Sequence, residues 1–370
     1  MNILILNWRD SKNPKSGGAE IVTLEHAKAW IKAGNKVTWF TSKFKNSKTE
    51  EVIDGIKIVR AGNFFTVYLL APIFYLFTKN KFDLVIDEIH GIPFFTPLYV
   101  RKPKIAFIHE VAGEIWDYMY PFPINKIGKL IEPLFYIPYK NTKFMTVSDS
   151  TKQSLMTVGI GKENIEVINN GISNPVLDEP SEKEKDPIFI FVSRVVKMKG
   201  TENVIKAFFG IQKQLKDAKL WIVGDGDKLY VEHLKQVIKT YPIKLKVQFF
   251  GKVNEQEKLV LMRKASLLLH ASVKEGWGLV VIEAASQATP SVVYDVAGLR
   301  DSVKDGKTGV VLRENTPEEM AKQAINLFED KVEYEKLQAN SLAWAKSLTW
   351  ENSTKRSDDL IDKVTNSRHE

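Results

Sequence analysis

Two carboxylates frame a glycine-containing segment in the second half of the chain. Residues Glu275–Glu283 read EGWGLVVIE, directly after an apolar run and at the start of a helical pattern. Gly276 and Gly278 let the backbone pass close to a ligand, and a helix beginning near Leu279 directs its dipole at an anion. Glu283 lies about one turn into this helix on an apolar face, so its carboxylate needs a partner. That partner is either a pair of ribose hydroxyls or an internal Lys or Arg.

Two cations occupy an earlier loop of the same kind. Ser193–Gly200 reads SRVVKMKG and connects an apolar run to a helical pattern. The Arg194 guanidinium can bind a phosphate through two hydrogen bonds, and the Lys199 ammonium adds a compact charge. The loop therefore predicts a phosphate site. The alternative is a solvated basic loop, in which Lys197 is a bystander.

A third candidate is the glycine pair Gly17-Gly18, which follows the first apolar run and opens the first long helical pattern. A helix N-terminus that begins with two glycines can accept an anion. The segment is neither a P-loop nor the G-x-G-x-x-G dinucleotide fingerprint. Taken alone, a Gly-Gly turn is more often structural.

The elements that must position these residues are short apolar runs that alternate with amphipathic stretches. This alternation is typical of βα units on a parallel sheet. A helix is expected at Ala19–Ala33, closed by Gly34-Asn35. The expected strands are Ile3–Asn7, Lys36–Thr41, Leu84–Asp87, Ile105–His109 and Phe144–Ser148, then Ile188–Ser193, Leu220–Gly224, Val247–Gly251, Ser266–Ala271 and Ser291–Tyr294.

The two series of strands predict two α/β domains with a cleft between them. The charge-rich, Pro-bracketed stretch Asp178–Asp186 is the best linker in the sequence. Ligands of open α/β sheets bind beyond the carboxyl ends of strands, which is where the three candidate segments lie. We expect an N-terminal domain over residues 1–172, joined by 350–370 at the end of the chain, and a C-terminal domain over 187–349.

Composition sets the class of protein. The 370 residues suit two domains, and 44% hydrophobic with 26% charged residues describes an ordinary globular chain. The absence of cysteine excludes thiolate catalysis, cysteine metal sites and disulfides. An apolar run starts almost at Met1 without a signal-peptide pattern, so a cytoplasmic location is expected.

The net charge of +8 is unevenly distributed. Residues 1–174 carry 22 Lys and Arg against 16 Asp and Glu, a balance of +6, and the remainder of 31 against 29 gives +2. The basic half indicates either an anionic partner or simply a generally basic proteome.

The segment Phe64–Phe77 is nearly all apolar and is followed by Lys79 and Lys81. It is too short to span a membrane, which takes roughly 20 apolar residues. The favoured interpretation is a buried helix between two strands. The other is an interfacial helix, which would place the protein peripherally on the inner face of the membrane.

The candidate segments together resemble the family 4 glycosyltransferases of the GT-B superfamily. The resemblance extends over nearly the whole chain. The matching residues are Gly17-Gly18-Ala19-Glu20, His109-Glu110, Val147-Ser148, Asn170-Gly171, Arg194, Lys199-Gly200, Gly224-Asp225-Gly226, Phe250-Gly251, Glu275–Glu283 and Leu348-Thr349-Trp350-Glu351. It implies a GT-B fold of two facing Rossmann-like domains with an interdomain cleft.

The resemblance also implies residue roles in the transfer of a sugar from a nucleotide diphosphate. Arg194 and Lys199 would hold the diphosphate, Glu275 the sugar hydroxyls and Glu283 the ribose. His109 would face the reacting sugar. The remaining donor contacts would come from Gly17, Gly18, Val253, Gly276, Trp277, Gly278 and Leu279.

The mechanism implied by the resemblance is retaining transfer, with attack on the same face from which the nucleotide departs. Fixed cations and helix N-termini stabilise the charge that develops on the leaving phosphate. No metal and no cofactor are therefore expected. Asp225-Gly226-Asp227 looks like a metal-binding pair of aspartates, but its place between a strand and a helix favours a turn.

The acceptor region is expected after His109. Glu114, Trp116 and Tyr118 suit stacking on a sugar ring, contact with a lipid headgroup or plain loop packing. A glycan or lipid-linked acceptor, an anionic membrane surface and no nucleic acid are the expected partners. The alternatives are a sugar-nucleotide epimerase or hydrolase of the same fold and a non-catalytic partner of another transferase.

Overall fold

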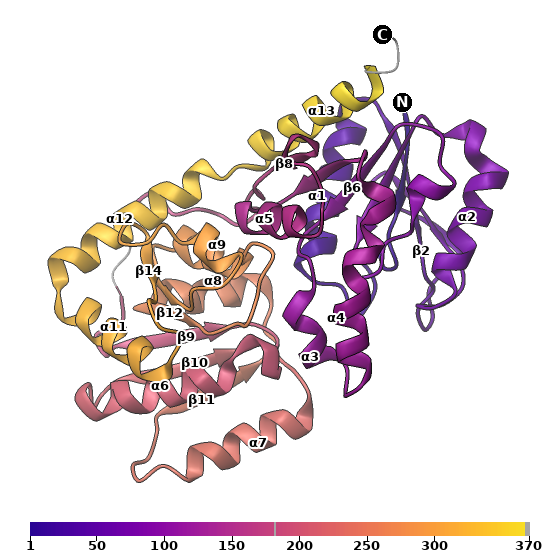
Figure 1. Cartoon of the computed structure of the whole chain (residues 1–370). Coiled ribbons are helices and arrows are strands. Elements are labelled where there is room, and N and C mark those ends of the chain that lie inside the picture. Colours follow the sequence, from indigo (N-terminus) through magenta and orange to yellow (C-terminus); the bar gives the residue numbers. More distant parts are fainter. Residues whose placement is uncertain (181–182, 367–370) are drawn as a thin grey trace. The chain divides into compact units, whose positions relative to one another are not determined.

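The computed structural model describes residues 1–180 and 183–366 (Figure 1). The chain divides into two compact units. The first consists of residues 1–171 and the C-terminal segment from Trp350, and the second of residues 172–349. Each unit is built on its own sheet, and these sheets confirm the predicted α/β class.

The first unit contains an eight-stranded sheet in the order β3-β4-β2-β1-β5-β6-β7-β8. Neighbouring strands are parallel, except that β3 is antiparallel to β4. The central strand β1 is buried along nearly its whole length, as apolar strands covered on both faces must be. The strands are β1 (Asn2–Leu6), β2 (Lys36–Thr41), β3 (Glu50–Ile53), β4 (Ile56–Arg60), β5 (Leu84–Ile89), β6 (Lys104–Ile108), β7 (Lys143–Thr146) and β8 (Ile165–Val167).

The helices of the first unit include one from the far end of the chain. They are α1 (Gly18–Lys32), α2 (Val67–Thr78), α3 (Trp116–Met119), α4 (Ile124–Phe135), α5 (Asp149–Thr157) and α13 (Trp350–Asn366). Figure 1 shows α13 beside α1. The Ser357 hydroxyl of α13 accepts a hydrogen bond from Trp30 Nε1 at 3.1 Å and lies 3.0 Å from His26 Nδ1. Burial lowers the pKa of His26 to about 3, so this contact is between neutral groups.

Sequence reasoning missed the β3–β4 hairpin. Its turn is Asp54-Gly55, and both residues have positive φ, at 49° and 82°. The two-residue type I′ hairpin turn requires a positive φ at both of its central residues, and Asp-Gly is a preferred pair at these positions. The signal was therefore present in the sequence.

Helix α2 corrects the favoured interpretation of Phe64–Phe77 as a buried helix. Only Val67, Ala71 and Tyr75 of the helix are buried, at the spacing of one helical face. The opposite face is exposed, and Phe77 has 87% of its surface accessible. No helix among the described residues is both long and apolar enough to cross a membrane.

The second unit contains a six-stranded parallel sheet in the order β11-β10-β9-β12-β13-β14. Its strands are β9 (Ile188–Val192), β10 (Lys219–Val223), β11 (Val247–Gly251), β12 (Leu267–His270), β13 (Ser291–Val293) and β14 (Gly309–Val311). Its helices are α6 (Thr201–Gln214), α7 (Lys228–Lys239), α8 (Glu255–Lys264), α9 (Leu279–Ser286), α10 (Leu299–Ser302), α11 (Pro317–Glu329) and α12 (Lys331–Ser347).

Two apolar clusters cover the two faces of this second sheet. Alternate residues of β9 divide between them, with Phe189 and Phe191 in one cluster and Ile188 and Ile190 in the other. A strand covered on both faces leaves only its ends for polar chemistry. The loops at the carboxyl ends are therefore the place to look for a site.

Candidate active site

The loop after β9 is held against its neighbours by close backbone contact. Gly200 has φ +70°, and a Cβ there would lie 1.9 Å from the carbonyl oxygen of Ala271. A Cβ on Gly224, which directly follows β10, would lie 1.9 Å from the carbonyl oxygen of Ser193. Only glycine fits at either position. These contacts place the ends of β9, β10 and β12 side by side.

Lys199 and Glu275 meet at this edge of the sheet. Lys199 Nζ lies 2.6 Å from Glu275 Oε1, and the two side chains are only 12% and 15% exposed. Burial is the largest single effect and acts to raise the pKa of Glu275, but the charge and hydrogen bond of Lys199, together with His270 and Ser272, outweigh it and the pKa is lowered. The carboxylate is thus held in its ionised form, ready to accept hydrogen bonds.

His270, the last residue of β12, lies close to this ion pair. Its Nε2 is 3.6 Å from Glu275 Oε1. Burial lowers the pKa of His270 to about 4, so the ring is neutral at neutral pH. The ion pair therefore consists of one lysine and one carboxylate.

Arg194 lies on the same loop as Lys199 and is exposed. Within the described part of the chain it forms no ion pair, and the nearby Lys197 is exposed as well. The guanidinium therefore remains available for an anionic ligand. This is the arrangement expected of a phosphate contact.

Glu283 forms an ion pair with a lysine, which is one of the two partners predicted for it from the sequence. Lys258 Nζ lies 2.9 Å from Glu283 Oε2 and 2.7 Å from Glu255 Oε2. Burial raises the pKa of Glu283, and the Lys258 charge offsets part of that effect. A ribose contact for the remaining oxygen stays a prediction.

The segment between the two glutamates adopts the predicted turn into a helix. Gly278 has φ +82° and caps the N-terminus of α9, which begins at Leu279. Trp277 is buried, and its indole nitrogen has no hydrogen-bond partner among the described residues. Gly276 is half-buried, and Val253 packs against the core beside Phe250.

Asp225-Gly226-Asp227 takes the turn role that its position predicts. The Asp227 carboxylate accepts a hydrogen bond from the backbone N–H of Tyr230 at 3.0 Å and so caps α7. The Asp225 carbonyl accepts one from Val195 N–H at 2.8 Å. Asp225 therefore links the loop after β10 to the loop after β9.

In the first unit, Gly17 and Gly18 lie at the N-terminus of α1 as predicted. The end of this helix is organised by Glu20, which is fully buried. Glu20 accepts a hydrogen bond from Gly17 N–H at 2.7 Å and another from Arg9 Nε at 2.6 Å. The carboxylate thus fixes the glycine turn and neutralises Arg9.

His109 directly follows β6, and a buried carboxylate holds its ring. Its Nε2 lies 2.9 Å from Glu88 Oε1. Burial lowers the pKa of His109 to about 4, with partial opposition from the Glu20 charge, so the imidazole is neutral at neutral pH. Burial also raises the pKa of Glu88, against the effect of His90.

Sequence reasoning missed Arg9, Glu88 and His90. Glu88 and His90 directly follow the strand predicted at Leu84–Asp87, and Glu88 Oε1 also contacts Thr23 Oγ1 at 2.8 Å. Their place at a carboxyl strand end was the available signal. These residues match no known motif, so the sequence alone did not distinguish them from the polar residues that commonly follow strands.

The expected acceptor residues divide into exposed and structural ones. Glu114 and Tyr118 are exposed. Trp116 donates from Nε1 to Glu132 Oε2 at 3.0 Å, and a Cβ on Gly128 of α4 would lie 2.3 Å from its ring. Trp116 is therefore fixed against α4.

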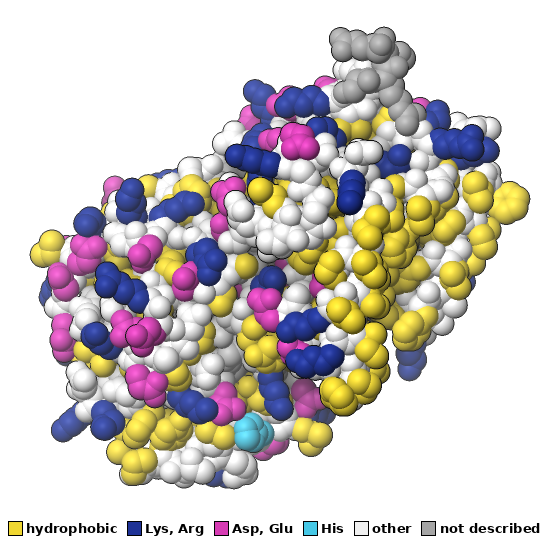
Figure 2. All heavy atoms as spheres, viewed as in Figure 1, with side chains coloured by type: hydrophobic (Ala, Val, Ile, Leu, Met, Phe, Trp, Pro, Cys, Tyr) yellow, Lys and Arg dark blue, Asp and Glu magenta, His cyan; other side chains and the backbone are white. Residues whose placement is uncertain are grey.

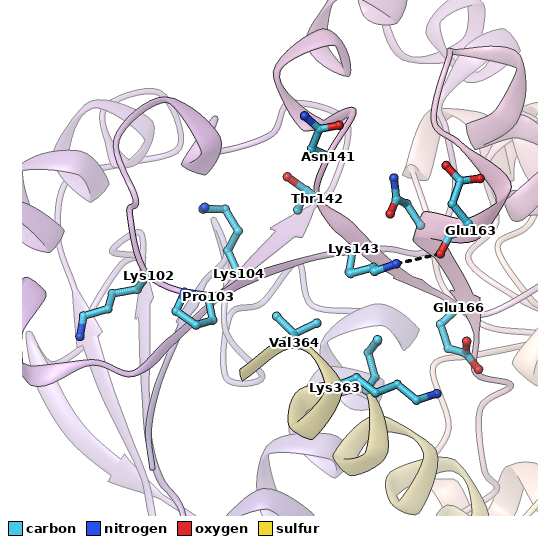
Figure 3. A pocket seen from close by; sticks show the side chains of 12 residues that line it. Lys102, Pro103, Lys104, Asn141, Thr142, Lys143, Glu163, Glu166, Lys363 and Val364 are labelled. Atoms are coloured by element: carbon cyan, nitrogen blue, oxygen red, sulfur yellow. Dashed lines mark hydrogen bonds between the residues drawn. The ribbon is translucent and has the colours of Figure 1, made fainter. Parts of the chain in front are cut away.

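A cavity of about 340 Å³ opens at the amino ends of strands in the first sheet, opposite the carboxyl ends near which His109 lies. Figure 3 shows Lys104 and Lys143, at the starts of β6 and β7, near Lys363 and Val364 of α13. Lys143 Nζ donates to the Glu163 carbonyl at 2.9 Å. Because the cavity lies at the amino ends of the strands, it is separate from the His109 cluster.

Two family models match successive parts of the chain. Residues 16–174 match the model described as Glycosyltransferase Family 4, and residues 175–344 match Glycosyl transferases group 1. The chain belongs to the family 4 glycosyltransferases. Its enzyme class is that of a glycosyltransferase.

Curated relatives match this chain over different shares of their own length. An uncharacterized glycosyltransferase of Methanocaldococcus jannaschii is 26% identical over 85% of this chain and 76% of its own length. For four other curated relatives the match covers between 26% and 59% of their length.

Two solved structures share the GT-B fold over nearly all of the chain. A sucrose-phosphate synthase from Thermosynechococcus elongatus has a TM-score of 0.82 at 19% identity and is covered over 99% of both chains. Anabaena HepE in complex with UDP and glucose has a TM-score of 0.75 at 19% identity, over 98% of this chain and 100% of that one.

Replacing Arg194 and Lys199 by Ala is predicted to weaken the binding of a nucleoside diphosphate. Each change removes a charge-assisted hydrogen bond, and the exposed Arg194 alone should cost about 1.5 kcal/mol, roughly tenfold in Kd. Titration calorimetry measures the effect, and Lys197→Ala is the matched control because Lys197 is an exposed cation of the same loop. Equal affinities of the double variant and the control would place the diphosphate elsewhere.

Proposed function

We propose that this family 4 glycosyltransferase is a retaining, metal-independent enzyme that moves a sugar from a nucleotide diphosphate to a hydroxyl of a glycan or lipid-linked acceptor. The observation that carries the donor half is the Lys199–Glu275 pair beside the exposed Arg194. It puts cations and an ionised carboxylate within one strand-end loop cluster. The UDP and glucose named for the HepE complex support a donor of this chemistry.

The proposed chemistry follows from where negative charge develops. Cleavage of the sugar–phosphate bond leaves charge on the departing phosphate, which Arg194, Lys199 and the N-terminus of α9 stabilise. Glu275 accepts hydrogen bonds from the hydroxyls of the sugar. The acceptor hydroxyl attacks the same face, its proton passes to the departing phosphate, and the configuration is retained.

His109 is proposed to hold the reacting sugar from the first unit. Its neutral ring and its contact with Glu88 give it one orientation before the substrate arrives. A side chain fixed in this way loses little freedom when it binds. Gly17 and Gly18, at the N-terminus of α1, are proposed to approach the phosphates.

Turnover is predicted to require an acceptor and to survive EDTA. Fixed cations and helix dipoles already supply the positive field that a divalent metal supplies elsewhere. The measurement is nucleoside diphosphate release from UDP-, GDP-, ADP- and dTDP-sugars, with and without a lipid extract as the source of acceptor. Proton NMR of the product then reports its anomeric configuration.

Two results of this experiment would contradict the proposal. Release without acceptor indicates the epimerase or hydrolase alternative. Complete loss of turnover in EDTA, restored by Mg²⁺ or Mn²⁺, shows that the phosphate charge is neutralised by a metal.

The acceptor is proposed to be presented at an anionic membrane, on the cytoplasmic face. The support is an apolar surface on the first unit, here called the α2–α4 face, over which hydrophobic side chains gather in Figure 2. Its exposed members are Phe65, Leu69, Ile73, Leu76, Phe77, Leu98, Phe122, Ile124, Ile127, Leu130, Ile131, Leu134 and Ile137. So extensive an apolar surface is typical of an interaction site.

The loop after β5 joins the two helices of this face. The ring of Tyr68 in α2 is tilted against that of Phe94, with centroids 4.7 Å apart, and Phe135 of α4 meets Phe95 edge-on with centroids 5.9 Å apart. The helices therefore flank one segment of chain and can act on one surface. Exposed Lys79, Lys81, Arg101 and Lys102, with the partly exposed Lys104, supply the positive charge that favours anionic lipid, whereas Lys126 and Lys129 are paired with Asp117.

Wild-type protein is predicted to float with anionic liposomes at low salt and to dissociate at high salt. Phe77→Glu with Leu130→Glu should abolish flotation, because each puts a charge where an apolar side chain enters the interface. The matched control is Leu229→Glu with Val332→Glu, since these residues of the second unit are equally exposed. Changing Arg101, Lys102 and Lys104 to Glu tests the electrostatic part.

Absence of wild-type flotation at low salt would contradict the membrane proposal and favour a soluble acceptor. Equal loss with the control pair would show that any added charge releases the protein, and that the α2–α4 face is not the docking surface.

A further inference from the structure

Three potential metal ligands converge at the carboxyl ends of β5 and β6. Glu88 Oε1 lies 3.3 Å from His90 Nε2 and 2.9 Å from His109 Nε2. One ligand atom from each residue lies within 4.8 Å of the others. Glu88 is fully buried, and the two histidines are largely so.

These separations are close to those of a zinc site. Zinc binds imidazole nitrogen and carboxylate oxygen at about 2.0–2.2 Å in a tetrahedral arrangement, so neighbouring ligand atoms lie roughly 3.4 Å apart. The two measured separations of 2.9 and 3.3 Å fall just short of that value. Side-chain rotations that bring the three ligand atoms, which all lie within 4.8 Å of one another, to this spacing would admit the ion.

The groups behind the cluster are arranged as zinc sites require. His90 Nδ1 lies 3.5 Å from Glu20 Oε1, and Glu20 is itself held by Arg9. A carboxylate on one ring nitrogen orients the other toward a metal and makes it more basic. Thr23 Oγ1 donates a hydrogen bond to Glu88 Oε1 at 2.8 Å and so orients that carboxylate.

One buried atom of the cluster lacks a partner. Glu88 Oε2 has no hydrogen bond among the described residues. An unpaired buried carboxylate oxygen is costly, because burial removes its hydration without replacing it. A cation bound to this carboxylate would compensate for that loss.

We propose that Glu88, His90 and His109 bind one zinc ion, with the fourth position open. Two histidines and one glutamate form a known kind of zinc donor set with an open position. The two nitrogen ligands disfavour Mg²⁺, which prefers oxygen. The site thus selects a transition metal of the zinc type from the cellular divalent ions.

Zinc at this site inhibits sugar transfer, a consequence that rests on the proposed function. His109 Nε2 is occupied by the ion, and the ring can no longer take the position that the reacting sugar requires. The ion also adds two positive charges beside a histidine that is otherwise neutral. Zinc is therefore a reversible inhibitor of an enzyme that works without metal, and EDTA relieves the inhibition.

Binding is tested with Zn²⁺ alone on the full chain, by competition with a chromophoric chelator. Wild type is expected to bind one ion tightly. His90→Gln and Glu88→Gln each remove one ligand and should weaken binding more than 100-fold. Glu20→Gln should weaken it 10- to 100-fold, as loss of an orienting carboxylate does. His233→Gln, at an exposed histidine of the second unit, is the matched control.

Circular dichroism confirms that the variants are folded, and three outcomes decide the proposal. Zinc affinity of His90→Gln or Glu88→Gln equal to wild type overturns the site. Loss of zinc affinity in both, with the His233→Gln control unchanged, supports it. If zinc binds but does not slow transfer, the inhibition is overturned. Absence of transfer by metal-free wild type contradicts the proposed function instead and leaves the binding result intact.

Discussion

The structure is constrained by the free energy that it takes to bury carboxylates at the ends of strands. Glu20, Glu88, Glu275 and Glu283 all lie at or near the carboxyl edges of the two sheets, largely removed from water. A carboxylate there is stable only with a cation or hydrogen-bond donors beside it. Each of the four has such partners, and these partners fix the loops and helix ends around it.

The same compensation prepares the site for a charged substrate. Lys199 is bound to Glu275, and under the proposed function this contact already holds the lysine at the phosphate site. Glu20 fixes the glycine turn of α1, and Glu88 fixes the His109 ring. The exposed Arg194 supplies a further cation, which forms no ion pair with a carboxylate among the described residues.

The sequence was sufficient for the parts of the molecule that follow local rules. Strand ends, the helix at Gly18 and the loop from Arg194 to Lys199 followed from apolar periodicity and glycine placement. The Lys258 partner of Glu283 could not be named, because the two residues approach only through the packing of α8 on α9. Glu88 and His90 were missed for a related reason, since their meeting with His109 depends on the order β5-β6 in the sheet. The exposed face of α2 was misjudged because an all-apolar helix does not reveal which side is covered.

The central claim is that the buried pair divides its work, Lys199 binding the diphosphate and Glu275 the sugar. The most direct test compares Glu275→Gln with wild type in calorimetric titrations of the preferred nucleotide sugar and of its nucleoside diphosphate alone. The account predicts that the variant loses roughly tenfold in affinity for the nucleotide sugar, because charge-assisted hydrogen bonds to the hydroxyls become neutral. It also predicts that affinity for the diphosphate alone is kept or increased, because Lys199 is released from its internal partner. An equal loss for both ligands, or no loss for either, would contradict this division.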